Sequence, residues 1–222
     1  MVKGNLLSRW WGVTMMGIMI SLTGSISPVS VLAESDSSDP SETYTTIMDW
    51  CLNRENLSPD ARYTVQLILR EAGTFNCARA SENLLNLNRL DLNTSLIRDV
   101  APLGSLTNLT ELRLMNNRIS DISPLANLTN LENLDLSYNL LTDVSDLGQL
   151  MNLRVLNLSY NEINDISTLN NLSRLNELNL NHNNISNISS LSSLERITYL
   201  FVRHNPIEDQ TCPISPRFIC QF

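Results

Sequence analysis

The stretch LTNLTELRLMNNRISDISPLAN, residues 106–127, is followed at once by LTNLENLDLSYNLLTDVSDLGQ, residues 128–149. The second stretch repeats most of the apolar positions of the first. The period is 22 residues and is marked by Leu84, Leu106, Leu128, Leu150, Leu172 and Leu194. One such repeat cannot bury its own leucines, so neighbouring repeats must stack and share one apolar core.

Each repeat contains the pattern L-x-x-L-x-L-x-x-N, with Ile or Val allowed at the apolar places. The copies are LTELRLMNN, LENLDLSYN, LRVLNLSYN, LNELNLNHN and ITYLFVRHN, and an earlier copy, LNRLDLNTS, has Ser95 in place of Asn. In ELRLM, residues 111–115, leucines alternate with Glu111, Arg113 and Met115, and this period of two predicts a short strand. Ile119, Ile122 and Leu125 follow at a spacing of three, which suits tight turns or short 3₁₀ segments.

This pattern resembles the leucine-rich repeat in the 22-residue bacterial class typified by internalins, over residues 84–207 and about six copies. The resemblance implies an α/β repeat solenoid, with a concave parallel β-sheet and a convex side of short 3₁₀ turns. It also implies that the recurring asparagine turns inward to bond the backbone of adjacent turns, where an amide can both donate and accept. These asparagines are Asn117, Asn139, Asn161, Asn183 and Asn205.

Both ends of the repeat region need a cover, because a terminal repeat exposes half of the core. Residues 44–83 predict a helical N-terminal cap, in which Ser58 is the N-cap of a helix that starts at Pro59 and stops at Gly73. The repeat frame fails after Ile207, so residues 208–222 form the expected C-terminal cap. The combination of helical cap, repeats and terminal Cys-Pro loop looks like exported leucine-rich repeat proteins from cyanobacteria.

The N-terminal residues predict export. Lys3 and Arg9 precede an apolar run over residues 10–20, and small Ala33 ends the region, so residues 1–33 have the order of a secretory signal peptide. The alternative is an uncleaved anchor, although the run is shorter than the ~20 residues that span a bilayer. Residues 34–43, ESDSSDPSET, are an expected disordered acidic leader. The predicted location is periplasmic or extracellular, with no stable membrane insertion after signal removal.

Four cysteines are present: Cys51, Cys77, Cys212 and Cys220. An even number in an exported chain predicts disulfides, and four cysteines allow three connectivities. The sequence does not choose among them. Pairing within each end is favoured, because residues 78–211 hold no cysteine and keep the two pairs apart.

The charge balance argues against nucleic acid as a partner. The whole chain has a net charge of −8, and loss of residues 1–33 removes two basic residues and no acidic ones, which leaves −10. Nucleic acid binding needs a basic face that neutralises phosphates. The ordinary reading of this acidity is solubility.

The outward positions of the strands are the candidate binding surface. The variable outward positions of the repeat pattern hold every aromatic residue between residues 76 and 217 and both histidines of the chain. Aromatic residues and Arg are typical anchors of protein interfaces. The predicted partner-binding residues are Met115, Tyr138, Tyr160, His182, Tyr199, Phe201, Arg203 and His204. The alternatives are simple packing over the sheet, or a structural, envelope-associated module that binds polysaccharide by stacking its sugars on the same rings.

Catalysis and metal binding are disfavoured. A hydrolase triad needs a nucleophile, a histidine and a carboxylate in one pocket, but His182 and His204 are expected on an open face. The seven glycines form no phosphate-binding loop. A zinc site wants three or four ligands, and no acidic residue shares the histidine column nearby. No cofactor is therefore expected, and the predicted role is binding of a protein or peptide.

Overall fold

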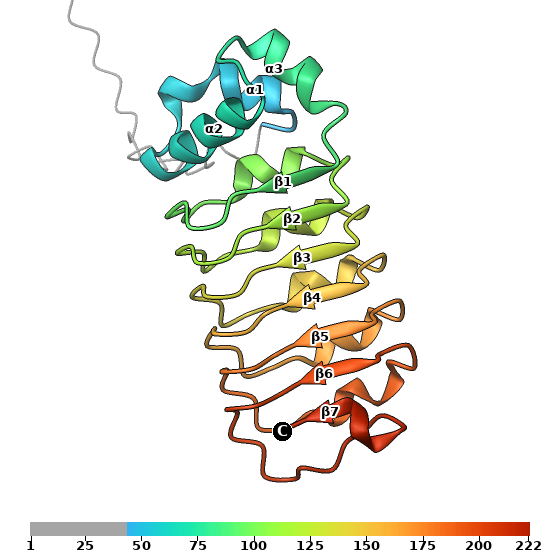
Figure 1. Ribbon diagram of the computed structural model, residues 1–222. Coiled ribbons are helices and arrows are strands. Elements are labelled where there is room, and N and C mark those ends of the chain that lie inside the picture. The colour runs from blue at the N-terminus through green and yellow to red at the C-terminus, as the bar shows by residue number, and fades with distance from the viewer. Residues whose placement is uncertain (1–43) are drawn as a thin grey trace, which may run out of the picture. The chain divides into compact units, whose positions relative to one another are not determined.

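The computed structural model describes residues 44–222, so the predicted signal peptide and acidic leader lie outside the described residues. All described residues fall within one compact unit, Ser38–Phe222. Seven parallel strands form one sheet in the order β1-β2-β3-β4-β5-β6-β7, so that every strand lies beside its neighbours in sequence (Figure 1). This is the parallel-sheet solenoid that the sequence predicts.

The first six strands have three residues each and recur every 22 residues. They are β1 (Arg89–Asp91), β2 (Glu111–Arg113), β3 (Asn133–Asp135), β4 (Val155–Asn157), β5 (Glu177–Asn179) and β6 (Tyr199–Phe201). Each residue pairs with the equivalent residue of the next repeat, as Leu112 does with Leu134. Equivalent side chains therefore form straight columns across the sheet.

Short 3₁₀ segments form the opposite side of the repeats, as the spacing of three predicts. They are Ala101–Ser105, Ser123–Asn127, Ser145–Gln149, Ser167–Asn171 and Ser189–Ser193. An aspartate precedes four of these segments, and its side-chain Oδ1 accepts a hydrogen bond from the backbone N–H two residues further on. Asp143, for example, accepts from Ser145 N at 2.8 Å. These hydrogen bonds hold the pKa values of Asp143 and Asp165 below the ordinary value for aspartate.

The core lies between the sheet and the 3₁₀ segments. The inward leucines of the strands, such as Leu112 and Leu134, meet the isoleucines and leucines of the turns, such as Ile119 and Leu125, and all four are buried. One buried cluster runs without a break from Ile47 in the N-terminal cap to Ile219 in the C-terminal cap. Removal of this apolar surface from water is the main force that stacks the repeats.

The N-terminal cap consists of α1 (Ile47–Leu52), α2 (Pro59–Glu71) and α3 (Cys77–Leu84) (Figure 1). Ser58 Oγ accepts from Ala61 N at 3.0 Å, and Gly73, with φ +71°, follows the end of α2, as expected from the sequence. Thr64 on α2 donates its hydroxyl to Asp99 O at 2.6 Å, which ties the cap to the first repeat.

Two elements differ from the sequence expectation. Helix α3 was not predicted, and Leu84, the first of the evenly spaced leucines, is its last residue. Asn76 explains the helix start, because its side chain accepts from Arg79 N at 3.0 Å. The C-terminal cap also adds β7 (Cys220–Gln221), which pairs with β6 through Leu200 and Phe201.

Candidate functional site

The candidate site is the outer side of the sheet, which we call the sheet face. It consists of the outward side chains of β1–β6 and of the residues that follow each strand. Its outward side chains form four columns across the sheet, with one residue per repeat in each. Two columns lie within the strands and begin at Arg89 and Asp91; the other two follow the strand ends and begin at Asn93 and Thr94. A groove of about 550 Å³ runs across β2–β5 on this face. Its lining includes Glu111, Arg113, Met115, Asp135, Val155 and Asn179.

The floor of the groove carries polar side chains that are held in place by the strand ends. Asp135 Oδ1 accepts from the backbone N–H of Ser137 at 2.9 Å and from its hydroxyl at 2.6 Å. Asn157 makes the same two bonds with Ser159, at 3.1 and 2.8 Å. Because these bonds fix the side chains, a partner would meet preordered polar groups at a small cost in entropy.

The charges at the β1–β2 end of the sheet face neutralise one another. Glu111 Oε1 lies 3.1 Å from Arg89 Nη2 and 2.7 Å from Arg113 Nε, and Arg113 also lies 3.8 Å from Asp91. Exposed pairs of this kind add little stability. Their effect here is that this end of the face has no net charge to attract a charged partner.

Four rings on the sheet face form a continuous stack, which we call the ring ladder: Tyr138, Tyr160, His182 and His204. Successive ring centroids are 4.0 Å apart, and the interplanar angles are 10°, 15° and 21°. All four residues have a left-handed backbone, with φ between 55° and 58°. Each ring occupies the same place in its repeat, one residue before the ladder asparagine, so the repeat spacing itself stacks the rings.

The stack perturbs the ionisation of its members. The side-chain hydrogen bond between Tyr138 and Tyr160 raises the pKa of Tyr138. Loss of surrounding water lowers the pKa of His182, and repulsion from the neighbouring His204 acts in the same direction. The neutral form of His182 is therefore favoured within the ring ladder.

The remaining predicted residues lie at the C-terminal end of the face. Tyr199 and Phe201 project from β6, with ring centroids 6.3 Å apart and planes inclined by only 9°. Arg203 follows two residues later and is exposed. The eight predicted binding residues therefore occupy three places: Met115 lines the groove, four residues build the ring ladder, and three belong to the last full repeat.

The stacking and the left-handed backbone were not anticipated from the sequence. The available signal was the constant phase of Tyr138, Tyr160, His182 and His204 directly before the asparagine. Residues at a fixed place in successive repeats stand about 4.8 Å apart, which is close enough for flat rings to stack. The sequence did not reveal the groove between Met115 and Asn179, because the polar residues that line it are of types common on any protein surface.

The recurring asparagines lie inward and bond the backbone of two repeats. Asn161 Nδ2 donates to Leu136 O and Leu158 O, both at 3.0 Å. Its Oδ1 accepts from Leu141 N at 3.0 Å. Four of the five are buried, and Asn205 is half-buried. In the first repeat, Ser95 stands where the later repeats have asparagine. Its backbone N–H donates to Asn117 Oδ1 at 3.1 Å, so the asparagine of the second repeat bonds the backbone of this turn.

Two disulfides lie outside the candidate site, one at each end of the repeats. Cys51 in α1 is joined to Cys77 in α3, and Cys212 is joined to Cys220 in β7. Within residues 44–222 there is no cluster of three or more His, Cys, Asp and Glu side chains that could hold a metal ion. No helix in this part of the chain has the length and apolarity of a membrane span.

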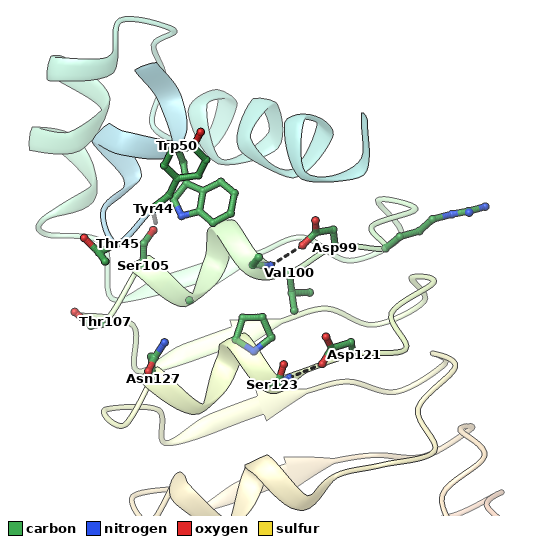
Figure 2. A pocket seen from close by; sticks show the side chains of 14 residues that line it. Tyr44, Thr45, Trp50, Asp99, Val100, Ser105, Thr107, Asp121, Ser123 and Asn127 are labelled. Atoms are coloured by element: carbon green, nitrogen blue, oxygen red, sulfur yellow. Dashed lines mark hydrogen bonds between the residues drawn. The ribbon is translucent and has the colours of Figure 1, made fainter. Parts of the chain in front are cut away.

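A second cavity, of about 880 Å³, lies on the 3₁₀ side between the N-terminal cap and the first two repeats (Figure 2). Its walls include Tyr44 and Trp50, whose rings meet edge to face at 5.1 Å. Asp99 and Asp121 accept backbone N–H groups there, from Ala101 at 2.8 Å and Ser123 at 2.9 Å. Both carboxylates thus cap turns of the scaffold, and no residue lining the cavity is a histidine or cysteine.

Comparisons with known proteins agree with this architecture. A family model of two leucine-rich repeats matches residues 85–127, 107–149, 129–171 and 152–193. The repeats of this chain therefore belong to the leucine-rich repeat family, as the sequence predicted. No match was found among curated proteins.

Among the solved structures that are similar to this chain, two share more than a quarter of its residues over the matched region. One is an internalin, inlF, from Listeria monocytogenes, with 36% identity and a TM-score of 0.54 over 59% of this chain and 45% of that one. The other is a leucine-rich repeat protein from Leptospira interrogans, with 27% identity and a TM-score of 0.54 over 63% of this chain and 37% of that one. This chain therefore spans less than half the length of either, and the likeness concerns the repeat module.

Proposed function

We propose that this chain is a non-catalytic exported module that binds a protein or peptide partner through the sheet face. Leucine-rich repeat modules of the internalin kind are typically protein-binding. The residues proposed to contact the partner are Met115, Tyr138, Tyr160, His182, Tyr199, Phe201, Arg203 and His204. The observation that carries the proposal is the groove of about 550 Å³, whose lining residues Asp135, Asn157 and Asn179 each stand three residues before a ring of the ladder.

The distribution of side chains supports the same proposal. Tyr138 and Tyr199 are about half exposed, at 47% and 53%, although Leu136 and Leu200 close to them in sequence are buried. Tyrosines held by a rigid scaffold lose little conformational entropy on binding and supply large contact area. The sheet face therefore provides anchors without the cost of ordering a loop.

The alternative, a structural module that binds polysaccharide, fits the ring ladder less well. Sugar rings stack on open aromatic faces. Within the ladder, each inner ring face is covered by its neighbour at 4.0 Å, so mainly the ring edges and the tyrosine hydroxyls remain for a ligand. Edges and hydroxyls suit polar and aromatic groups of a protein. Glycan arrays run beside protein capture separate the two ligands.

The two disulfides support an exported location, because structural disulfides persist in oxidising compartments. Whether that compartment is the periplasm or the medium is set by the cell that makes the protein. We propose no catalytic role: the sheet face is open, and the paired acids and arginines at its β1–β2 end neutralise one another.

The test is capture of partners by cross-linking in the native export compartment. The bait is the full chain, and the variant combines Tyr138→Ala, Tyr160→Ala and Phe201→Ala. The matched control combines Leu52→Ala, Leu140→Ala and Met151→Ala, which remove similarly exposed side chains outside the sheet face. Circular dichroism and thermal unfolding establish that both variants are folded.

The expected result is loss of the captured protein with the sheet-face variant and its retention with the control. Capture that is undiminished in a folded sheet-face variant would refute the site. Binding of a glycan by the wild-type chain that is lost in the sheet-face variant, with no protein captured by the wild-type chain, would favour the polysaccharide alternative.

A further inference from the structure

The C-terminal end of the sheet face differs in charge from the rest of it. We call the group Tyr199, Phe201, Arg203 and His204 the aromatic-basic corner. The sheet face carries three arginines. Arg89 and Arg113 both form ion pairs with Glu111, whereas Arg203 forms none with any described residue. An exposed arginine without an acidic neighbour is a ready partner for a carboxylate from another molecule.

The acidic residues of the neighbouring repeats lie away from Arg203. Glu177 is in register with Tyr199, and Arg203 comes four residues later, about 13 Å further along the strand direction at ~3.3 Å per residue. Asp209 accepts from Thr211 N at 2.9 Å and lines a different cavity with residues 186–189. Arg203 therefore forms no ion pair with a described residue, on a protein that is acidic overall.

The apolar half of the corner lies directly beside this charge. Phe201 is half-buried and Tyr199 is 53% exposed, and their nearly parallel rings stand side by side on β6. The adjacent strand β7 has only two residues and pairs with Leu200 and Phe201, so β7 has no residue in register with Tyr199. An aromatic or aliphatic side chain could rest on this pair while an acidic neighbour reaches Arg203.

We propose that the aromatic-basic corner recognises a peptide segment in which a carboxylate side chain lies next to an aromatic or aliphatic one. This inference rests on the proposed function and names the partner chemistry at one end of the sheet face. The groove ends at Glu177 and Asn179 on β5, and the corner begins on β6, so one extended segment can occupy both. The charge of Arg203 then sets which end of the segment lies at the C-terminal repeat, because opposite charges steer orientation.

The test uses short synthetic peptides of equal length that pair Phe with Glu, Phe with Gln or Phe with Lys. Binding to the full exported chain is measured by isothermal titration and by fluorescence anisotropy. The variants are Arg203→Ala, Arg203→Lys and the control Arg118→Ala. Arg118 is exposed, forms no ion pair with a described residue and lines a different cavity, together with Ser58 and Ser120.

The wild-type chain is expected to bind the Glu peptide about tenfold more tightly than the Gln peptide, with the Lys peptide weakest. Arg203→Ala removes this preference, Arg203→Lys keeps part of it, and Arg118→Ala leaves it unchanged. Added salt reduces the preference, because it screens exposed charges.

Equal binding of the Glu and Gln peptides, an unchanged preference in Arg203→Ala, or no binding of the Glu peptide would each overturn the inference. The proposed function is judged separately, by partner capture with the variant at Tyr138, Tyr160 and Phe201. If that variant loses capture while the peptides show no acidic preference, the sheet face binds a partner of different chemistry.

Discussion

At the scale of the residue, one side chain per repeat satisfies the backbone of the sharp bend that follows each strand. Asn161 bonds two carbonyls and one N–H group through a single buried amide. Buried backbone groups that lose such a partner keep the full cost of leaving water. The asparagine therefore belongs to the scaffold, although its column runs next to the ring ladder.

We expect Asn161→Ala to lower the free energy of unfolding by about 2–4 kcal/mol, because three buried backbone groups lose their partner. The control is Asn164→Ala, at an exposed asparagine whose side chain makes no hydrogen bond to a described residue, with an expected change below about 0.5 kcal/mol. Urea unfolding followed by circular dichroism measures both. Equal losses would contradict a special role for the ladder amide.

At the scale of the element, the 3₁₀ segments of successive repeats pack closely enough to restrict side-chain size. A Cβ atom added at Gly104 would lie 2.5 Å from Pro124 O in the next repeat. At Gly148 the nearest atoms would be Thr168 O at 3.1 Å and a side-chain atom of Asn171 at 3.2 Å. The nearest atom is a backbone oxygen at both positions, but it lies much closer at Gly104, so the two glycines differ in their tolerance of substitution.

We expect Gly104→Ala to destabilise the protein by about 1–3 kcal/mol, since the first two 3₁₀ segments must move apart. Gly148→Ala is the matched comparison and should cost less. Thermal unfolding of the two variants gives the order. A larger loss for Gly148→Ala would mean that the repeats adjust more easily at Pro124 than this packing indicates.

The ring ladder acts as one element, because the repeat spacing brings its four rings into contact. The pKa of His182 lies below its ordinary value of 6.5, through loss of water and repulsion from His204. The unfolded chain therefore takes up this proton first as the pH falls. The contribution of His182 to stability is therefore greatest above about pH 6.5 and decreases as the pH falls from there toward its folded pKa.

We expect the NMR titration midpoint of His182 to rise when His204→Gln removes the neighbouring charge. The same variant should flatten the loss of stability below about pH 6.5. Glu162→Gln is a control that changes one exposed charge outside the ring ladder. A midpoint of His182 that is the same with and without His204 would show that desolvation alone sets it.

At the scale of the whole molecule, the core is a one-dimensional stack whose ends carry the disulfides. Cys51–Cys77 joins α1 to α3 in the N-terminal cap, and Cys212–Cys220 closes the cap that adds β7. Each repeat contacts only its neighbours, so the central strands do not depend directly on either disulfide. Local opening should therefore begin at whichever end loses its cross-link.

We expect the double change Cys212→Ser and Cys220→Ser, which opens a link across a sequence separation of 8, to cost about 2–3 kcal/mol. Hydrogen exchange should lose protection in β6 and β7 and retain it in β3 and β4. The matched change Cys51→Ser and Cys77→Ser should instead expose α1 and α3. A uniform loss along the chain in either variant would contradict end-local opening.

Much of this architecture follows from the pattern of residues alone. The alternation in ELRLM predicts the strand, the spacing of Ile119, Ile122 and Leu125 predicts the 3₁₀ side, and Ser58 with Gly73 marks the longest helix of the cap. These signals are local and repeat in every copy, so each supports the next. Helix α3 was not predicted, although Asn76 caps its start. Strand β7 was not predicted because it pairs only after the chain has returned to β6.

The sequence by itself determined the period, the inward leucines and the asparagine column, because these depend only on which residues recur at a fixed spacing. Tertiary structure alone decided that Tyr138, Tyr160, His182 and His204 stack ring on ring and that a groove runs from Met115 to Asn179. It also decided that Arg203 is left without the ion pairs of Arg89 and Arg113. The physical reason is that stacking, groove depth and charge pairing depend on distances between repeats, which exist only once the core has packed them together.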